Sequence, residues 1–157
     1  MVRKSSEKRR EEITSALLEV MARRGYAKAT IKRIAEEAGL TPGLVHYHFS
    51  GKQEILLELI DRLVREEQTE IRELLESDRE PREKLRMLID KQLATGESAR
   101  HNAVAAWVAV AAEALRQPEV RAAFAGALST LSTAFRAVIE EGIDDDVFRL
   151  ATGKDAE

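Results

Sequence analysis

The sequence contains no cysteine, few aromatic residues and only three prolines, and each shortage excludes a class of protein. Without cysteine the chain has no disulfide, no thiol nucleophile and no thiolate ligand for a metal ion. Aromatic residues make up 4% of the chain, so Ala, Leu, Ile and Val must fill most of the core. Ala and Leu favour helices, and strand-forming residues are sparse. The composition therefore predicts an all-α protein.

Long apolar stretches are also scarce. The longest apolar run covers residues 103–112, far short of the about 20 residues that a membrane-spanning helix needs. The N-terminus is basic and polar and lacks the apolar segment of a signal peptide. We therefore expect a cytoplasmic protein with no membrane segment.

The net charge of −3 conceals an uneven distribution. Residues 1–52 contain eleven Lys or Arg against six Glu, whereas the remainder contains fourteen basic and twenty-two acidic residues. A basic segment joined to an acidic one is typical of a nucleic-acid-binding protein whose other part has a different task. Chance clustering on a solvated tail explains the charges equally well.

Apolar periodicity divides the chain into helices. The first is expected over about 8–24, followed by a short helix at 31–38 capped by Thr30 and ended by Gly39. Thr41 caps the next, which has Pro42 in its first position and runs to about Tyr47. Longer helices are expected over about 52–76, over about 98–116 and over about 118–141, with another beyond residues 78–81 that carries Leu85, Leu88, Ile89 and Leu93.

Two short helices joined by a tight turn predict a helix-turn-helix. Ala35 is small, as it must be where the second helix crosses the first. Gly39 stands where the turn needs a left-handed backbone, and Val45 points back between the two helices. Agreement at these constrained positions favours a DNA-binding domain.

Residues 30–49 (TIKRIAEEAGLTPGLVHYHF) resemble the signature of the TetR family of transcriptional regulators, and 50–56 (SGKQEIL) resemble the family's entry into its fourth helix. His46 departs from the family pattern, where tyrosine is commoner, and Gly51 is an additional residue in the Ser-Lys step. The resemblance implies a three-helix DNA-binding domain at 1–52 and a helical effector-binding and dimerisation domain at 53–157.

The resemblance also implies roles for individual residues. Tyr47 and Lys52 match positions that contact the DNA backbone, and Lys32 and Arg33 are candidates for flanking phosphate contacts. Thr30 and Thr41 cap helix N-termini, which are suitable sites for phosphate. The exposed side of the second short helix would meet base edges through Pro42, Gly43, Leu44 and His46.

Purely structural roles remain open for several of these residues. Thr30 and Thr41 serve as helix caps whether or not they contact phosphate, and Tyr47 can pack against its neighbours. The basic residues between Arg3 and Arg10 form either an arm that enters an adjacent minor groove or a solvated tail. His48 and Phe49 are expected to be structural.

In the second domain the resemblance is weaker. The stretch 107–121 is similar to the branch of the family that includes the choline-responsive repressors. We expect an apolar pocket for an unidentified small-molecule effector, with plain core packing as the alternative for each residue. The candidate lining residues are Leu74, Met87, Ile89, Leu93, His101, Trp107, Val110 and Phe124.

Residues 144–148 resemble the loop that precedes one more long helix of the family at its dimer interface. We expect that helix to be missing, in a naturally short or truncated chain, with a weakened or rearranged dimer. Asp144, Asp145 and Asp146 lack the spacing of a calcium loop and are interpreted as a solvated turn.

The sequence thus predicts a ligand-responsive repressor that binds a palindromic double-stranded operator as a homodimer, without metal or cofactor. No catalytic arrangement of Ser, His, Asp or Cys is present, so we expect no enzyme activity. A transcriptional activator, a nucleoid-associated protein and a helical interaction module without DNA binding are the alternatives.

Overall fold

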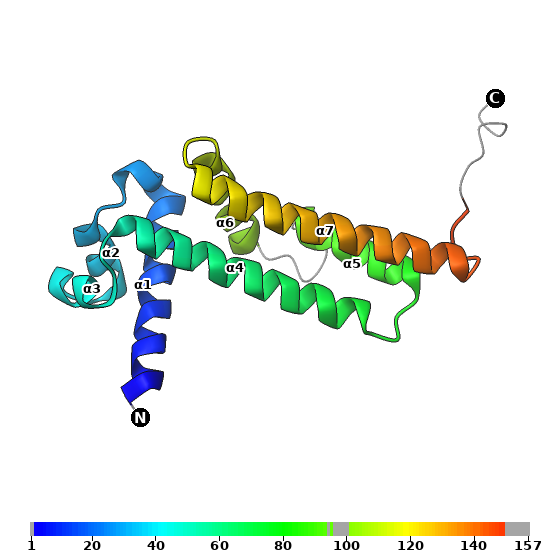
Figure 1. Cartoon of the computed structure of the whole chain (residues 1–157), viewed down its shortest axis with the longest axis horizontal. Coiled ribbons are helices and arrows are strands. Elements are labelled where there is room, and N and C mark those ends of the chain that lie inside the picture. Colours follow the sequence, from blue (N-terminus) through cyan, green and yellow to red (C-terminus); the bar gives the residue numbers. More distant parts are fainter. Residues whose placement is uncertain (1, 94, 96–100, 150–157) are drawn as a thin grey trace. The chain divides into compact units, whose positions relative to one another are not determined.

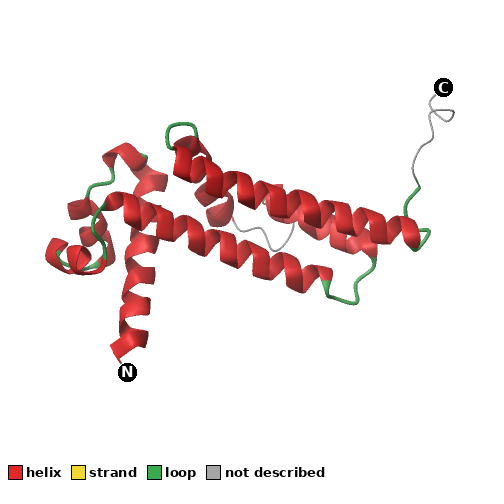
Figure 2. Ribbon diagram, viewed as in Figure 1, coloured by secondary structure: helices red, strands yellow, loops and turns green. Residues whose placement is uncertain are grey.

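The computed structural model describes residues 2–93, 95 and 101–149, with side chains described for 6–93, 95 and 104–149. The described residues form seven α-helices and one short 3₁₀ helix, without a strand (Figures 1 and 2). The predicted all-α fold is therefore confirmed. The elements are α1 (Val2–Arg24), η1 (Tyr26–Lys28), α2 (Ile31–Ala38), α3 (Pro42–His48), α4 (Lys52–Leu75), α5 (Pro81–Leu93), α6 (His101–Ala114) and α7 (Pro118–Asp144).

The short helices begin and end where their capping residues predicted. The side-chain oxygen of Thr30 accepts a hydrogen bond from the N–H of Arg33, and that of Thr41 accepts one from the N–H of Leu44, both at 3.3 Å. Helix α1 begins at Val2, before the predicted start at Lys8. The prediction missed these residues because they are polar and carry no apolar periodicity, although they are compatible with a helix.

The chain divides into two compact units, one comprising Met1–Arg65 with Ala105–Phe124 and the other Glu66–Val104 with Ala125–Glu157. Helices α4, α6 and α7 therefore each contribute residues to both. The division into functional domains at 1–52 and 53–157 stays a prediction, as does the absence of a final helix.

The first unit has one apolar core. Ile13 and Leu17 of α1 meet Ile34 of α2, and all three are fully buried. Burying a side chain of this size stabilises the fold by about 1.5–3 kcal/mol. The other large, fully buried side chains of this core come from α3, the first half of α4, α6 and α7: Val45, Ile55, Leu56, Leu59, Ile60, Val110 and Val120, with Phe49 just after α3.

The second unit has a smaller core around Ile71, Leu88, Ala134 and Val138. Beside it, Lys84 is 3% exposed. Its Nζ donates to Glu141 Oε1 at 2.7 Å and to the carbonyl oxygen of Leu75 at 3.1 Å. These acceptors offset the cost of burying an ammonium group, so loss of Glu141 would leave an uncompensated charge.

Helix α7 is long and apolar enough to cross a membrane, judged by length and composition alone. Helices in the cores of water-soluble proteins pass the same test, so this property is weak support for a membrane segment. In the second unit α7 exposes large apolar side chains, including Leu128 at 51% and Ile139 at 38%.

Helix α7 ends in a tight turn at its three aspartates, which are all exposed. Asp146 has a φ of 57°, and the N–H groups of Val147 and Phe148 both donate to the carbonyl oxygen of Gly142 at 2.8 Å. The Phe148 ring then lies so close to Gly142 that a Cβ there would be 2.1 Å from a ring carbon. Gly142 is therefore required by this close approach.

We predict that Gly142→Ala lowers the free energy of unfolding by about 1–3 kcal/mol, because the new methyl group displaces the Phe148 ring. Gly126→Ala on the same helix is the control, since a Cβ there meets nothing within 4 Å. The control should stabilise the helix by up to about 1 kcal/mol. Urea unfolding followed by circular dichroism measures both. A loss in Gly142→Ala that persists undiminished in a Phe148→Ala background would contradict the steric explanation.

Candidate nucleic-acid interface

Helix α3 presents one face to solvent and buries the other. Val45 is fully buried and Phe49 is 2% exposed, whereas Leu44 is 36% and Tyr47 81% exposed. Pro42, Gly43 and His46 are also exposed. The structure therefore brings all the predicted base-contacting residues and Tyr47 together on the solvent side of one short helix.

The turn before α3 fixes how that face is presented. Gly39 adopts a left-handed conformation with φ 66° and ψ 33°, as its position predicted. Its N–H donates to the carbonyl oxygen of Glu36, and the N–H of Leu40 donates to that of Ala35 at 2.8 Å. These two bonds form a Schellman motif, which ends α2 and redirects the chain. Ala35 is fully buried, in agreement with its predicted place beneath the crossing helix.

The two capping threonines are exposed at the N-termini of α2 and α3. Each side-chain oxygen accepts a hydrogen bond from its own helix. Each hydroxyl nevertheless keeps its proton, which remains a donor for a phosphate oxygen. The capping role of Thr30 and Thr41 is confirmed, while the phosphate contact stays a prediction.

The predicted basic residues differ in how far they are engaged within the protein. The Lys32 side chain is 80% exposed, with Glu36 4.0 Å away. Arg33 is exposed too, but its Nη1 donates to the carbonyl oxygen of Lys28 at 2.7 Å. Lys32 is therefore the more accessible cation at the start of α2.

Lys52 is half-buried at the start of α4. Its Nζ donates to the carbonyl oxygen of Tyr26 at 2.9 Å and lies 4.0 Å from the centre of the Tyr26 ring. Burial, followed by the charge of Glu113, raises the pKa of the Tyr26 hydroxyl to about 12. This hydroxyl donates to Gln53 Oε1 at 3.0 Å. Lys52 is thus held against η1 and is not grouped with the exposed residues of α3.

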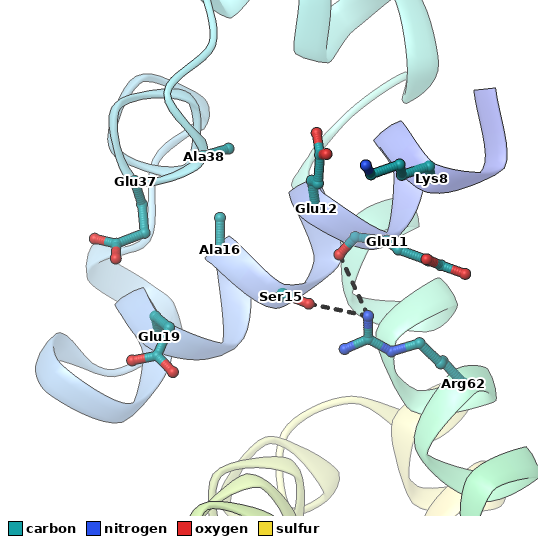
Figure 3. A pocket seen from close by; sticks show the side chains of 9 residues that line it. All are labelled: Lys8, Glu11, Glu12, Ser15, Ala16, Glu19, Glu37, Ala38 and Arg62. Carbon is teal, nitrogen blue, oxygen red and sulfur yellow. Dashed lines mark hydrogen bonds between the residues drawn. The ribbon is translucent and has the colours of Figure 1, made fainter. Parts of the chain in front are cut away.

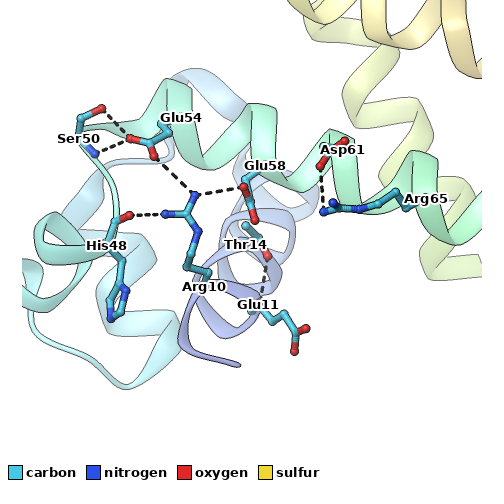
Figure 4. A network of polar contacts seen from close by, with 9 residues as sticks. All are labelled: Arg10, Glu11, Thr14, His48, Ser50, Glu54, Glu58, Asp61 and Arg65. Atoms are coloured by element: carbon cyan, nitrogen blue, oxygen red, sulfur yellow. Dashed lines mark hydrogen bonds and ion pairs between the residues drawn. The ribbon is translucent and has the colours of Figure 1, made fainter. Parts of the chain in front are cut away.

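Arg10 of α1 points toward α3 and α4, which contradicts its interpretation as part of a solvated tail. The side chains of Arg3 and Lys4 lie outside the described residues, and a DNA contact of this segment stays a prediction. Figure 4 shows its guanidinium donating to the carbonyl oxygen of His48 at 2.6 Å and to Glu58 Oε2 at 3.1 Å. Glu54 lies 3.5 Å away, and the Phe49 ring centre lies 4.1 Å from the guanidinium carbon. These contacts could not be predicted from local sequence, because Arg10 and its partners are far apart along the chain.

The Glu54 side chain accepts two hydrogen bonds at the N-terminus of α4. Its Oε2 accepts from the backbone N–H of Ser50 at 2.8 Å and from the Ser50 hydroxyl at 2.7 Å (Figure 4). The bond to the Ser50 N–H is the glutamate half of a capping box, displaced by one residue because Gly51 stands between Ser50 and the helix. The Ser50 hydroxyl donates to Glu54 and does not complete the box. The two Ser50 donors, with a smaller effect of Arg10, hold the pKa of the Glu54 carboxyl below its usual value.

A shallow hollow of about 510 Å³ lies along α1, bordered by the end of α2 and by α4 (Figure 3). Its border includes the carboxylates of Glu11, Glu12, Glu19 and Glu37. Arg62 donates from the border to the carbonyl oxygen of Glu11 and the hydroxyl of Ser15. Lys8 and Arg62 also border the hollow, and Glu12 and Glu37 pair with Arg9 and Arg23, so its charges are mixed.

The predicted effector-pocket residues are divided between the two units. In the first, Val110 is buried in the core, and the half-buried rings of Trp107 and Phe124 lie 6.1 Å apart. In the second, Leu74 packs against the smaller core. The other candidates there are exposed: Met87 at 39%, Ile89 at 41% and Leu93 at 66%. The side chain of His101 lies outside the described residues.

No group of three or more His, Cys, Asp or Glu side chains within the described part of the chain is placed to hold a metal ion.

Two families match the sequence. Residues 13–59 match "Bacterial regulatory proteins, tetR family". Residues 81–157 match "BetI-type transcriptional repressor, C-terminal". The first match contains α2, α3 and the turn between them, and the second contains α5 to α7.

Curated relatives point the same way. The chain is 34% identical over 113 residues to the HTH-type transcriptional regulator BetI of Agrobacterium fabrum, covering 72% of this chain and 54% of that protein. It is 29% identical to the BetI regulator of Brucella anthropi, covering 72% of this chain and 58% of that protein. The chain thus spans little more than half the length of these relatives.

Solved structures share the fold. A regulator from Saccharomonospora viridis, solved in complex with choline, has a TM-score of 0.79 and 30% identity, covering 91% of this chain and 74% of that one. A TetR transcription regulator from Haloarcula marismortui has a TM-score of 0.74 and 28% identity, covering 90% and 74%.

We predict that Glu54→Gln destabilises the protein at pH 7 and has little effect at pH 3. The pKa of Glu54 is lowered by folding, so its contribution is present above the usual pKa of a glutamate, about 4.3. The contribution is lost as the pH falls through the lowered value. Because Glu54 is largely accessible to water, the difference at pH 7 should be under about 1 kcal/mol.

Urea unfolding at both pH values measures this effect. The control is Glu73→Gln, at an exposed position on the same helix. An equal loss in Glu54→Gln at pH 7 and pH 3 would mean that the carboxylate charge does not stabilise the start of α4.

Proposed function

The chain belongs to the TetR family of bacterial regulatory proteins, and we propose that it is a transcriptional repressor that binds a palindromic operator as a homodimer. The observation that carries this proposal is the exposed face of α3, held on a turn that Gly39 fixes. A helix so presented has the form of a recognition helix, which enters the major groove. The matched families are of regulators, and the site offers binding groups without catalytic ones.

We assign base contacts to Leu44 and His46 and phosphate contacts to Tyr47, Thr30, Thr41 and Lys32. The apolar Leu44 suits a thymine methyl group, and the His46 imidazole can donate to or accept from a base edge. Pro42 and Gly43 have small side chains or none, and a Cβ at Gly43 would meet nothing within 4 Å. Such a surface lets the helix N-terminus approach the DNA closely.

Lys52 and Arg33 take a different part in the proposal. Their nitrogens already donate to backbone carbonyl oxygens of η1, at Tyr26 and Lys28. Both residues therefore brace the connection between α1 and α2 and add positive potential near the DNA backbone. Direct phosphate contact by either side chain would use its remaining N–H groups.

The homodimer places two copies of α3 on the two halves of the operator. In TetR relatives the second domain dimerises, and the exposed Leu128 and Ile139 of α7 support pairing through the second unit. Their spacing of eleven residues sets both on the same side of the helix. A cytoplasmic location, where the operator is found, completes this proposal.

We propose a quaternary ammonium compound such as choline as the effector. The Saccharomonospora viridis regulator was solved with choline, and the matched C-terminal family is of the BetI type. In this chain Trp107 and Phe124 supply adjacent aromatic rings within the first unit, and aromatic faces attract such cations. The effector would release DNA by binding one arrangement of α4 more tightly than the other.

The proposal predicts that Lys32→Ala weakens binding to all DNA duplexes. The slope of log K against log salt concentration should become shallower by about 0.9 for each chain bound. Fluorescence anisotropy measures this, with a duplex that the wild-type protein selects from a random library and a scrambled duplex of equal length. Arg86→Ala is the control, since that side chain is also exposed (81%) and paired at i,i+4.

Tyr47→Phe should weaken binding about 10- to 100-fold, as expected for a lost hydrogen bond to a charged phosphate oxygen, without changing the salt slope, because no charge is removed from the protein. A stoichiometry of two chains per duplex is expected. If the wild-type protein binds selected and scrambled duplexes equally well, the protein does not recognise an operator and the proposed function is wrong.

Choline binding is testable through Trp107, the single tryptophan of the chain. Choline chloride should change the Trp107 emission saturably and weaken binding to the selected duplex. Potassium chloride at the same ionic strength should reproduce neither the saturation nor the full loss of binding. Equal, unsaturated responses to the two salts would exclude choline as the effector.

A further inference from the structure

Helix α3 is too short to hold its own orientation. It has seven residues, whereas an isolated helix shorter than about 12 residues is marginal in water. Its first turn is fixed by the Thr41 cap, and its apolar side by the burial of Val45. In its last turn the Val45 carbonyl oxygen accepts from the N–H of Phe49 at 2.9 Å, but the carbonyl of the final residue, His48, has no partner within the helix. The C-terminal end therefore depends on contacts from elsewhere.

Arg10 supplies such a contact. Its Nη1 donates at 2.6 Å to the carbonyl oxygen of His48, the last residue of α3, while Nη2 donates to Glu58 of α4 (Figure 4). A cation at a helix C-terminus is favoured by the helix dipole. The fork geometry of the guanidinium allows one side chain to hold both helices in fixed directions.

We propose that Arg10 is the positioning residue of the recognition helix, acting on DNA binding through His48 and not through a phosphate. The proposal rests on the function proposed above. Arg10 holds the carbonyl group of His48, and the His48 ring packs edge-on against the Tyr47 ring, with centroids 5.1 Å apart. We call the bonds from Arg10 to His48 and Glu58 the Arg10 clamp. The clamp thereby fixes the position of Tyr47 and the angle at which Leu44 and His46 meet the bases.

The contacts of Arg10 distinguish this role from that of a DNA-contacting arginine. Its side chain is 28% exposed, it stacks on the buried Phe49 at 4.1 Å, and two carboxylates, Glu54 and Glu58, compensate its charge. An arginine compensated in this way releases few counterions on DNA binding. Arg10 should therefore govern sequence selection while leaving the salt dependence unchanged.

The neighbouring Arg9 offers a matched control. It lies on the same helix, carries the same charge and is 38% exposed, but it pairs with Glu12 of its own helix. Replacing either arginine by alanine removes the same charge from the same helix. Any difference between the two variants therefore reflects the contacts that Arg10 makes to His48, Glu58 and Phe49.

The experiment compares wild-type protein with Arg10→Ala, Arg10→Lys and Arg9→Ala on the selected and scrambled duplexes over a range of salt concentrations. Circular dichroism identifies a temperature at which every variant is folded. Arg10→Lys is included because it keeps the charge but lacks the fork, and because it remains informative if Arg10→Ala does not fold.

Arg10→Lys and Arg10→Ala are expected to bind the selected duplex at least tenfold more weakly, with the salt slope unchanged. On the scrambled duplex Arg10→Ala should match Arg9→Ala, and Arg10→Lys, which keeps the charge, should match the wild-type protein. A parallel loss on both duplexes, with a slope lower by about one in Arg10→Ala, would make Arg10 a phosphate contact and overturn the proposal. Wild-type affinity and selectivity in Arg10→Lys would also overturn it.

Hydrogen exchange separates this inference from the proposed function. Backbone amides of 44–49 should exchange faster in both Arg10 variants than in wild type and Arg9→Ala, while those of α2 remain protected. Unchanged exchange at 44–49 would refute the clamp even if the protein binds its operator. Faster exchange in a protein that selects no DNA sequence would confirm that Arg10 holds α3 and contradict the proposed function alone.

Discussion

The crossing of α3 over α2 is the constraint on which the interface depends. Val45 and Ala35 are both fully buried in the same core, where the small side chain of Ala35 is compatible with a close approach of the two helices. Gly39 provides the left-handed turn between the two helices, at φ 66°. These three requirements are steric, so they leave few alternatives at their positions. Once they are met, Leu44, His46 and Tyr47 must face solvent together.

Polar contacts then set the direction of the exposed helix. Thr41 holds its beginning, Arg10 its end, and the Ser50–Glu54 bonds fix the start of the helix that follows. Each contact is limited on its own: the neutral Thr41 cap contributes about 0.5–1.5 kcal/mol, and the charge-assisted bonds of Arg10 and Glu54 about 1.5–3 kcal/mol each. Their joint effect is orientation, which matters for DNA recognition because base contacts require correctly placed donors and apolar groups.

The charged side chains of the first unit differ in whether they are accessible near α3 or engaged in contacts within the protein. Lys32 and the helix N-termini present positive potential beside α3. The hollow along α1 is bordered by both signs of charge, with four glutamates beside Lys8 and Arg62. Net charge along the sequence indicated a basic N-terminal segment, but it did not show which basic residues are accessible. Arg10, Arg33 and Lys52 all donate to carbonyl oxygens within the protein.

The sequence by itself determined the all-α fold, the caps at Thr30 and Thr41, the turn at Gly39 and the exposed residues of α3. These features follow from local rules, since capping, helix periodicity and left-handed glycine depend on residues a few positions apart. Only the tertiary structure decided the partners of Arg10 and Lys52, the packing of Phe148 on Gly142 and the grouping of residues 105–124 with the N-terminal helices. Such contacts join distant parts of the chain, and nothing in local sequence specifies which distant acceptor a long basic side chain will meet.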